Sequence, residues 1–175
     1  MPEPSGPPVD AVDRIVAAWR AERPDLDPSP IGVVGRVSRT SVRLQRRLDE
    51  VFAQHGLQPG GFDVLATLRR NGAPYRMSPS QLHRQLMIAS GSMTARLDRL
   101  EEAGLVAREP DPDDRRALLV TLTPAGFERI ERAVVDHLAN EQRLLAALDA
   151  DERATLAALL RKLLLHLGDG ADEPA

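Results

Sequence analysis

The sequence contains no cysteine, which excludes disulfides, thiol nucleophiles and cysteine-ligated zinc. Aromatic residues make up only 3% of the 175 residues, so a core built from the 42% of hydrophobic residues must consist mostly of leucine, valine and alanine. Such residues suit packed helices better than a β-sandwich, which usually depends on β-branched and aromatic side chains. The composition therefore predicts a mainly α protein.

Long hydrophobic runs are also missing, because no stretch approaches the roughly 20 apolar residues that a membrane helix requires. The first ten residues, MPEPSGPPVD, are acidic and proline-rich and lack the apolar region of a signal peptide. We therefore expect a soluble, cytoplasmic protein that has no membrane partner.

Neither sign of charge dominates, since 23 basic and 26 acidic residues give a net charge of -3. Nucleic-acid binders are often strongly basic, and this chain is not. Only residues 57–120 carry a positive excess, with nine arginines against eight acidic residues. Binding to DNA would therefore depend on a local cluster in the middle third of the chain.

Helical patterns flank a middle third of mixed pattern. Loose, disordered tails are expected at residues 1–8 and 168–175, which are rich in proline, glycine and aspartate. Residues 9–56 predict two N-terminal helices, and residues 123–167 predict two C-terminal helices with apolar stripes. Residues 57–122 between them predict a separate lobe.

The middle segment follows the order helix, short strand, short helix, turn, second helix and hairpin. This is the pattern of a winged helix-turn-helix, a DNA-binding fold. Ser78 and Pro79 followed by Gln81 predict a capped helix start. Two apolar runs around the polar turn EPDPDDRR predict a two-stranded wing.

The second helix of this pattern has the side chains that reading of the major groove requires. Met93, Leu97 and Leu100 step by four and three and are expected to face the core. The other side then presents small residues and arginines, which can fork onto guanine, and the wing adds arginines for phosphates or the minor groove. The residues predicted to contact DNA are Ser90, Ser92, Thr94, Ala95, Arg96, Arg99, Arg115 and Arg116. The alternative is that Arg96 and Arg99 are solvated neighbours of acids on the same helix.

An ordered set of motifs continues from this helix. Gly104-Leu105-Val106 precedes Arg108, Asp114-Arg115-Arg116 follows, and Leu122-Thr123 leads to Gly126. This set resembles the recognition helix, wing and strand-to-helix junction of the MarR family of bacterial transcription regulators, and the helix layout agrees over about residues 9–167. The resemblance implies a homodimeric repressor with interleaved terminal helices, whose two winged lobes read a pseudo-palindromic operator in double-stranded DNA.

The apolar stripes of the two C-terminal helices are broad enough for more than one partner surface. A monomer would leave much of that surface exposed. Packing against the first two helices is the alternative, and both arrangements hold together in an interleaved dimer. Residues 9–56 and 123–167 are therefore expected to form the dimerisation region.

Trp19, the only tryptophan, lies on a helix that precedes the usual start of the family fold. This extra helix resembles the PecS-like, urate-responsive branch, whose ligand residues match Trp19, Asp63, Arg96 and Arg108, with a further match at Asn71. An indole and two arginines suit a flat organic anion. The RPDLD segment is also similar to regulators that respond to citrate and trans-aconitate. The expected effector is therefore a small organic anion, urate first and a carboxylate second.

Each residue of this set also has a structural explanation. Trp19 could anchor the core or an interface, and Arg108 could pair with an acid of the wing. Asp63 in a first helical turn is stabilising through the helix dipole alone. Asn71 before Gly72 is an ordinary end of a helix.

Two other classes of function compete with DNA binding: an enzyme and a winged helix that binds protein. The histidines His55, His83, His137 and His166 are scattered over different helices. His137 and Glu141 could share a metal, but two ligands without a third are more typical of a solvated or dimer-facing pair than of a metal site. No glycine-rich phosphate loop, nucleophile elbow or H-E-x-x-H motif occurs. We therefore expect no catalysis and no cofactor, and the arginines of the wing favour DNA over protein.

Overall fold

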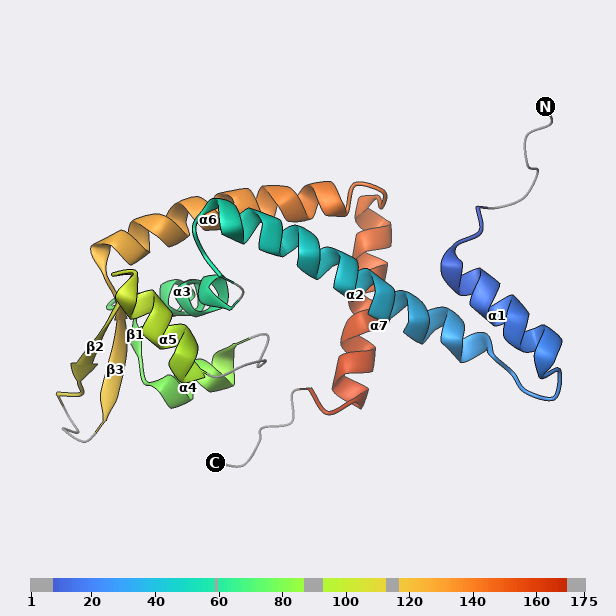
Figure 1. Cartoon of the computed structure of the whole chain (residues 1–175), viewed down its shortest axis with the longest axis horizontal. Coiled ribbons are helices and arrows are strands. Elements are labelled where there is room, and N and C mark those ends of the chain that lie inside the picture. Colours follow the sequence, from blue (N-terminus) through green and yellow to red (C-terminus); the bar gives the residue numbers. More distant parts are fainter. Residues whose placement is uncertain (1–7, 59, 87–92, 113–116, 170–175) are drawn as a thin grey trace. The chain divides into compact units, whose positions relative to one another are not determined.

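The computed structural model describes residues 8–58, 60–86, 93–112 and 117–169 (Figure 1). Almost all of the two expected tails lies outside this part. Within the described residues the chain forms seven helices and one three-stranded antiparallel sheet, which confirms the mainly α class. It divides into two compact units, Met1–Arg47 and Leu48–Ala175, which are described in turn.

The elements follow one another in the order that the sequence predicted. Their bounds are α1 (Ala11–Glu22), α2 (Ser29–Gln54), α3 (Gly61–Arg70), β1 (Arg76–Met77), α4 (Pro79–Gln85), α5 (Met93–Glu102), β2 (Val106–Pro110), β3 (Leu118–Leu122), α6 (Pro124–Leu144) and α7 (Ala150–His166).

The first unit contains α1 and the first part of α2. Asp10 caps α1 by accepting hydrogen bonds from the backbone N–H groups of Val12 and Asp13, so the helix begins two residues later than predicted. The buried side chain of Val12 lies against Gly35 of α2, where an added Cβ would be 3.3 Å from a Val12 methyl carbon. The prolines around position 28 predict a second helix that begins after Pro30, but α2 begins two residues earlier at Ser29, because the first turn of a helix accepts proline.

The second unit is built around α3, whose Val64, Leu65 and Leu68 are fully buried. Phe52 at the end of α2 stacks on Phe62 of α3, with ring centroids 4.3 Å apart. Helix α6 packs against α3 and supplies buried side chains of its own. Helix α3 in turn contacts α4 and α5, the helices of the helix-turn-helix.

Helices α4 and α5 occupy the positions predicted for the helix-turn-helix. The Ser78 hydroxyl accepts from the Gln81 N–H at 3.2 Å, and the Gln81 amide oxygen accepts from the Ser78 N–H at 2.9 Å, which confirms the capping box. Leu97 and Leu100 of α5 are buried in the core, as their spacing predicted. The turn at residues 87–92 lies outside the described part of the chain.

The sheet has the order β1-β3-β2, so the predicted two-stranded wing gains β1 as a third strand. In the wing, Arg108 pairs with Val120, and the pairing continues to Pro110 opposite Leu118. The apolar run Leu105–Arg108 alone predicts a strand that ends at Arg108, two residues before the observed end. Proline is accepted at position 110 because it lies at the end of β2, an edge strand of the sheet.

Thr123 and Gly126 join the sheet to α6. The Thr123 hydroxyl accepts from the Gly126 N–H at 3.0 Å and donates to the Gly104 carbonyl at 2.7 Å. A Cβ on Gly126 would lie only 1.9 Å from the carbonyl oxygen of Leu105. Helix α6 can therefore meet the base of the wing this closely only through a glycine.

The spacing of apolar residues predicts that Leu145 and Leu148 continue the stripe of the first C-terminal helix, but α6 ends at Leu144 and both leucines lie in the connection to α7. Asp149 and Glu152 form a capping box that starts α7. None of the helices in the described ranges is long and apolar enough to cross a membrane. Large leucine side chains remain exposed along α7, namely Leu156, Leu159, Leu163, Leu164 and Leu165.

Candidate DNA-binding and ligand-binding residues

Helix α5 carries four of the side chains predicted to contact DNA. Thr94 and Arg99 are exposed, whereas Ala95 and Arg96 are half-buried. The other four predicted residues lie outside the described part of the chain: Ser90, Ser92, Arg115 and Arg116.

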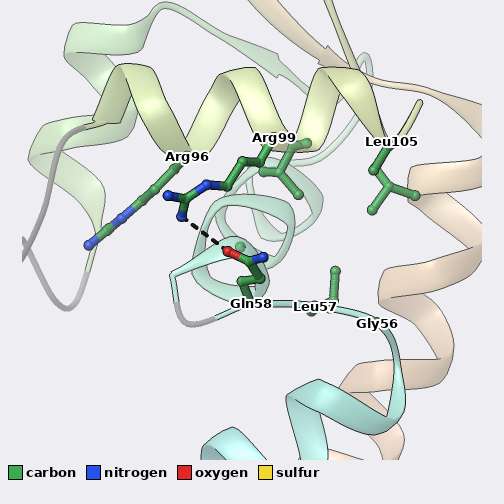
Figure 2. A pocket seen from close by; sticks show the side chains of 9 residues that line it. Gly56, Leu57, Gln58, Arg96, Arg99 and Leu105 are labelled. Carbon is green, nitrogen blue, oxygen red and sulfur yellow. Dashed lines mark hydrogen bonds between the residues drawn. The ribbon is translucent and has the colours of Figure 1, made fainter.

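Gln58 in the loop before α3 holds the guanidinium of Arg99. Arg99 Nη1 donates to the Gln58 amide oxygen at 3.0 Å, as Figure 2 shows. Both side chains line a small cleft of about 160 Å³ between this loop and α5, with Leu57 and Leu105 among its apolar residues. Sequence reasoning missed Gln58, because nothing in the local pattern links it to a residue 41 positions later.

Arg96 does not lie opposite the core as predicted. It stands on the flank of α5, and its side chain passes so close to Gly60 that an added Cβ there would be 2.7 Å from Arg96 Nε. Gly60 also has a φ of +80°, a backbone conformation that favours glycine. At 100° per residue, Arg96 lies only about 40° from Leu100 and about 60° from Met93 around the helix, which explains its half-buried position.

Asp63 lies in the first turn of α3, half-buried. Burial raises the pKa of its carboxyl above the ordinary value, and the neighbouring Asp49 adds to this effect. The positive charges of Arg96, His137 and Arg70 lower the pKa but do not outweigh burial. The charge of Arg96 is thus close enough to stabilise the Asp63 carboxylate, although burial removes much of the water around that carboxylate.

Arg108 joins the wing to α5. Its Nη2 donates to Asp98 Oδ1 at 2.6 Å, and its Nη1 lies 3.4 Å from Glu101 Oε2. The acids that Arg108 meets are therefore on the recognition helix, not on the wing as the alternative explanation supposed. With its side chain only 25% exposed, Arg108 fixes β2 against α5.

Trp19 and Asn71 complete the predicted ligand set. Trp19 lies on α1 in the first unit and is 47% exposed, whereas the other members of the set lie in the second unit. Asn71 follows α3 as its capping residue, and its N–H donates to the Thr67 carbonyl at 3.2 Å. Gly72 then takes a φ of +81°, so the pair ends the helix as the structural explanation expected.

Comparison with known proteins decides the family. Residues 57–118 match the model of the MarR family. The HTH-type transcriptional regulator PecS of Dickeya dadantii is 47% identical over 156 residues, which cover 89% of this chain and 94% of that protein. The chain belongs to the MarR family. It is thus a DNA-binding transcriptional regulator and not an enzyme.

Solved MarR-family structures agree with the winged helix-turn-helix fold. A MarR family transcriptional regulator from Streptomyces coelicolor is 29% identical with a TM-score of 0.69, and the match covers 82% of this chain and 98% of that chain. A mutant MarR from Escherichia coli, solved in complex with operator DNA, is 29% identical with a TM-score of 0.65. That match covers 89% of this chain and 99% of the mutant.

His137, which was considered with Glu141 for a metal, packs against aromatic rings in this MarR-family chain. His137 lies 3.3 Å from Glu141 through Nε2, and its ring centroid is 4.6 Å from that of Phe62. Among the residues that the structure describes, no group of three possible ligands could hold a metal ion. The contacts with Phe52 and Phe62 give His137 a packing role.

The raised pKa of Asp63 gives a prediction for stability. The unfolded chain ionises this carboxyl at about pH 4, before the folded protein does, so the charge destabilises the fold as pH rises through the folded-state pKa. Asp63→Asn is expected to raise the thermal unfolding midpoint at pH 7 by a few degrees, and the gain should disappear below about pH 4. Thermal unfolding followed by circular dichroism at several pH values measures both effects.

Asp25 provides the control for this measurement. It is exposed, and the hydrogen bond from Arg23 lowers the pKa of its carboxyl, the opposite direction to Asp63. Asp25→Asn should therefore give no gain at pH 7. An Asp63→Asn protein that is less stable than wild type at pH 7 would mean that Arg96 and its neighbours outweigh the cost of burial.

Proposed function

We propose that this MarR-family regulator is a homodimeric repressor that binds a pseudo-palindromic operator and is released by a small organic anion. The observation that carries the proposal is the exposed Arg99 on α5, in a chain that is 47% identical to PecS over 89% of its length. An exposed arginine at this position of a recognition helix can form two hydrogen bonds with guanine in the major groove.

We propose that a second copy of the chain buries the exposed apolar side chains of α7. Leu156, Leu163 and Leu164 share one face of α7 and are each at least 41% exposed. Contiguous apolar surface of this kind is rare on a monomer and typical of a protein interface. A two-fold dimer buries the same stripe from both subunits and places two copies of α5 for two half-sites.

Operator binding is tested on duplex DNA from the region upstream of the protein's own gene. We expect a gel shift with a dimer to DNA stoichiometry. The logarithm of affinity should fall linearly with the logarithm of salt concentration, by about 0.9 for each phosphate neutralised. Affinity that is insensitive to salt and no better than for random duplex would contradict operator recognition and favour a protein-binding winged helix.

The proposed effector is a small organic anion, with urate first and a tricarboxylate second. Its proposed contacts are Trp19, Asp63, Arg96, Arg108 and Asn71. Support comes from the neighbouring charges of Asp63 and Arg96 and from the position of Arg96 on α5 itself. An anion that pairs with Arg96 changes the charge beside the DNA-reading helix. By linkage, an anion that weakens DNA binding must bind the DNA complex more weakly than the free protein.

Fluorescence of Trp19, the only tryptophan, is expected to change when urate binds. Arg108→Gln should raise the dissociation constant for urate about tenfold or more, because one charge-assisted contact contributes about 1.5–3 kcal/mol. Fluorescence titration gives the constant, and competition in the gel shift gives the effect on DNA. The exposed Arg76 on β1 provides the control, and Arg76→Gln should bind urate as wild type does. If urate, citrate and trans-aconitate at millimolar concentration change neither fluorescence nor DNA binding, the anion site is wrong.

A further inference from the structure

The first unit contains a wide cleft of about 430 Å³ between α1 and α2. It is formed entirely within this unit, where Val12 packs on Gly35 and brings the two helices together. Four arginines from both helices line it, together with the hydroxyl-bearing Thr40. The arginines are Arg14, Arg36, Arg39 and Arg43. No role discussed so far uses this cleft.

The part of α2 that borders the cleft carries only positive charge. Between Ser29 and Arg47 the sequence holds five arginines and no acidic residue. Because residues three, four and seven apart share a helix face, Arg36, Thr40 and Arg43 lie on one side of α2. Arg39 and Arg43 are four residues apart on the same helix, a spacing at which like charges repel one another.

The acids nearest the cleft are already engaged. Asp10 Oδ2 accepts from Arg36 Nε at 2.9 Å, and its other oxygen accepts from two backbone N–H groups of α1. Asp13 Oδ1 accepts from Arg36 Nη2 at 2.6 Å, and its Oδ2 caps the Asp10 N–H. Arg36 is therefore neutralised by these two carboxylates.

The remaining arginines of the cleft have no such partner. Over the residues that the structure describes, the side chains of Arg14, Arg39 and Arg43 form no hydrogen bond and no ion pair. They come from two helices and face one cleft. Guanidinium groups bind carboxylate and phosphate oxygens through paired hydrogen bonds, which makes them suited to oxyanions.

We propose that this cleft binds a polyvalent oxyanion, a molecule with two or more phosphate or carboxylate groups, through Arg14, Arg39 and Arg43. Thr40 adds a hydroxyl donor at the same face. A single exposed ion pair contributes little, so several arginines must act together on a ligand with several charged groups. A ligand that contacts both helices also stabilises α1 on α2.

This site is separate from the proposed effector site, with which it shares no residue. It is also distinct from the exposed valines of α2, Val34 and Val37, which lie on another side of the helix and suit an apolar partner. The anion of this cleft and the anion that releases DNA can therefore be told apart by mutation.

The test is calorimetric titration of the full chain at low ionic strength with inorganic tripolyphosphate, citrate and orthophosphate. Tripolyphosphate or citrate should bind with one site per chain, and orthophosphate at least tenfold more weakly. The double variant Arg39→Gln/Arg43→Gln should lose at least tenfold in affinity. It should keep its helical circular dichroism, because these side chains have no partner in the fold.

Arg20 and Arg23 provide a matched control, since they belong to the same unit but do not line the cleft. Arg20→Gln/Arg23→Gln removes the same charge and should bind as wild type does. Preference for tripolyphosphate identifies a phosphate ligand, and preference for citrate a carboxylate. Equal losses in both double variants, or no binding of either polyanion, would overturn the site. Citrate binding that Arg39→Gln/Arg43→Gln retains but Arg96→Gln loses would overturn it too, and would assign the anion to the effector site instead.

Discussion

Gly126→Ala is expected to lower the free energy of unfolding by about 3 kcal/mol or more, which is the upper range for added volume in a packed region. The new Cβ would lie 1.9 Å from the Leu105 carbonyl oxygen, a backbone atom that cannot move aside as a flexible side chain can. Either α6 or the start of β2 must shift, and the Thr123 bonds that join them would be lost. Urea unfolding followed by circular dichroism measures the loss.

Gly61→Ala is the matched control, because Gly61 also lies in the first turn of a buried helix. There the added Cβ would meet only a Leu100 methyl carbon at 3.5 Å, an ordinary contact. Since alanine favours helices over glycine by about 1 kcal/mol, Gly61→Ala should be neutral or stabilising. A Gly126→Ala protein within about 1 kcal/mol of wild type would show that the junction is not as tight as the structure has it.

Arg99→Ala is expected to reduce affinity for the operator by about 5- to 150-fold. This range corresponds to the loss of about 1–3 kcal/mol, the contribution of one bidentate contact with guanine. The preference for operator over random duplex should fall with it, because a base contact is lost. Arg115→Ala at the wing should instead weaken binding to all sequences alike and reduce the salt dependence by about one phosphate. Gel shifts at several salt concentrations, on operator and random duplex, separate the two effects.

Gln58→Ala extends this experiment to the loop that holds Arg99. It should lower operator affinity less than Arg99→Ala does and add nothing to it in the double variant, because Gln58 acts through the bond to Arg99 Nη1. Arg132→Ala on α6 removes an arginine whose Nε bonds only within its own helix, to the Glu128 carbonyl, and serves as the charge control. Additive losses from Gln58 and Arg99 would mean that Gln58 acts by another route.

Local signals made much of the fold predictable. The capping boxes at Ser78 and Asp149 and the buried spacing of Leu97 and Leu100 depend on residues within one or two helical turns. Such patterns report on the physics of a single element. They located the helix-turn-helix and the wing without any knowledge of contacts between elements.

Contacts between distant elements account for what sequence reasoning missed. The short strand was predicted, but its pairing with the wing was not, because nothing local to Arg76 indicates that it lies opposite Thr121 of β3. The bond from Arg99 to Gln58 and the position of Arg96 over Gly60 depend on how a loop meets a helix. The structural explanation for Arg108 named an acid of the wing, whereas its partners are Asp98 and Glu101 of α5, because packing and not sequence distance decides among nearby carboxylates.

The close contact at Gly126 couples the start of α6 to the base of the wing, so a change of angle there displaces the far end of α6. Over its 21 residues α6 is about 30 Å long, so a tilt of about 6° at the junction moves its far end by about 3 Å. That displacement is close to the 3.4 Å rise of one base pair of DNA. In the proposed dimer, a small change of angle between the lobes and their shared helices would therefore change the distance between two recognition helices by a whole step of the duplex. In that proposed dimer, the close contact at Gly126 would limit this change of angle and so help to set the spacing of the two recognition helices.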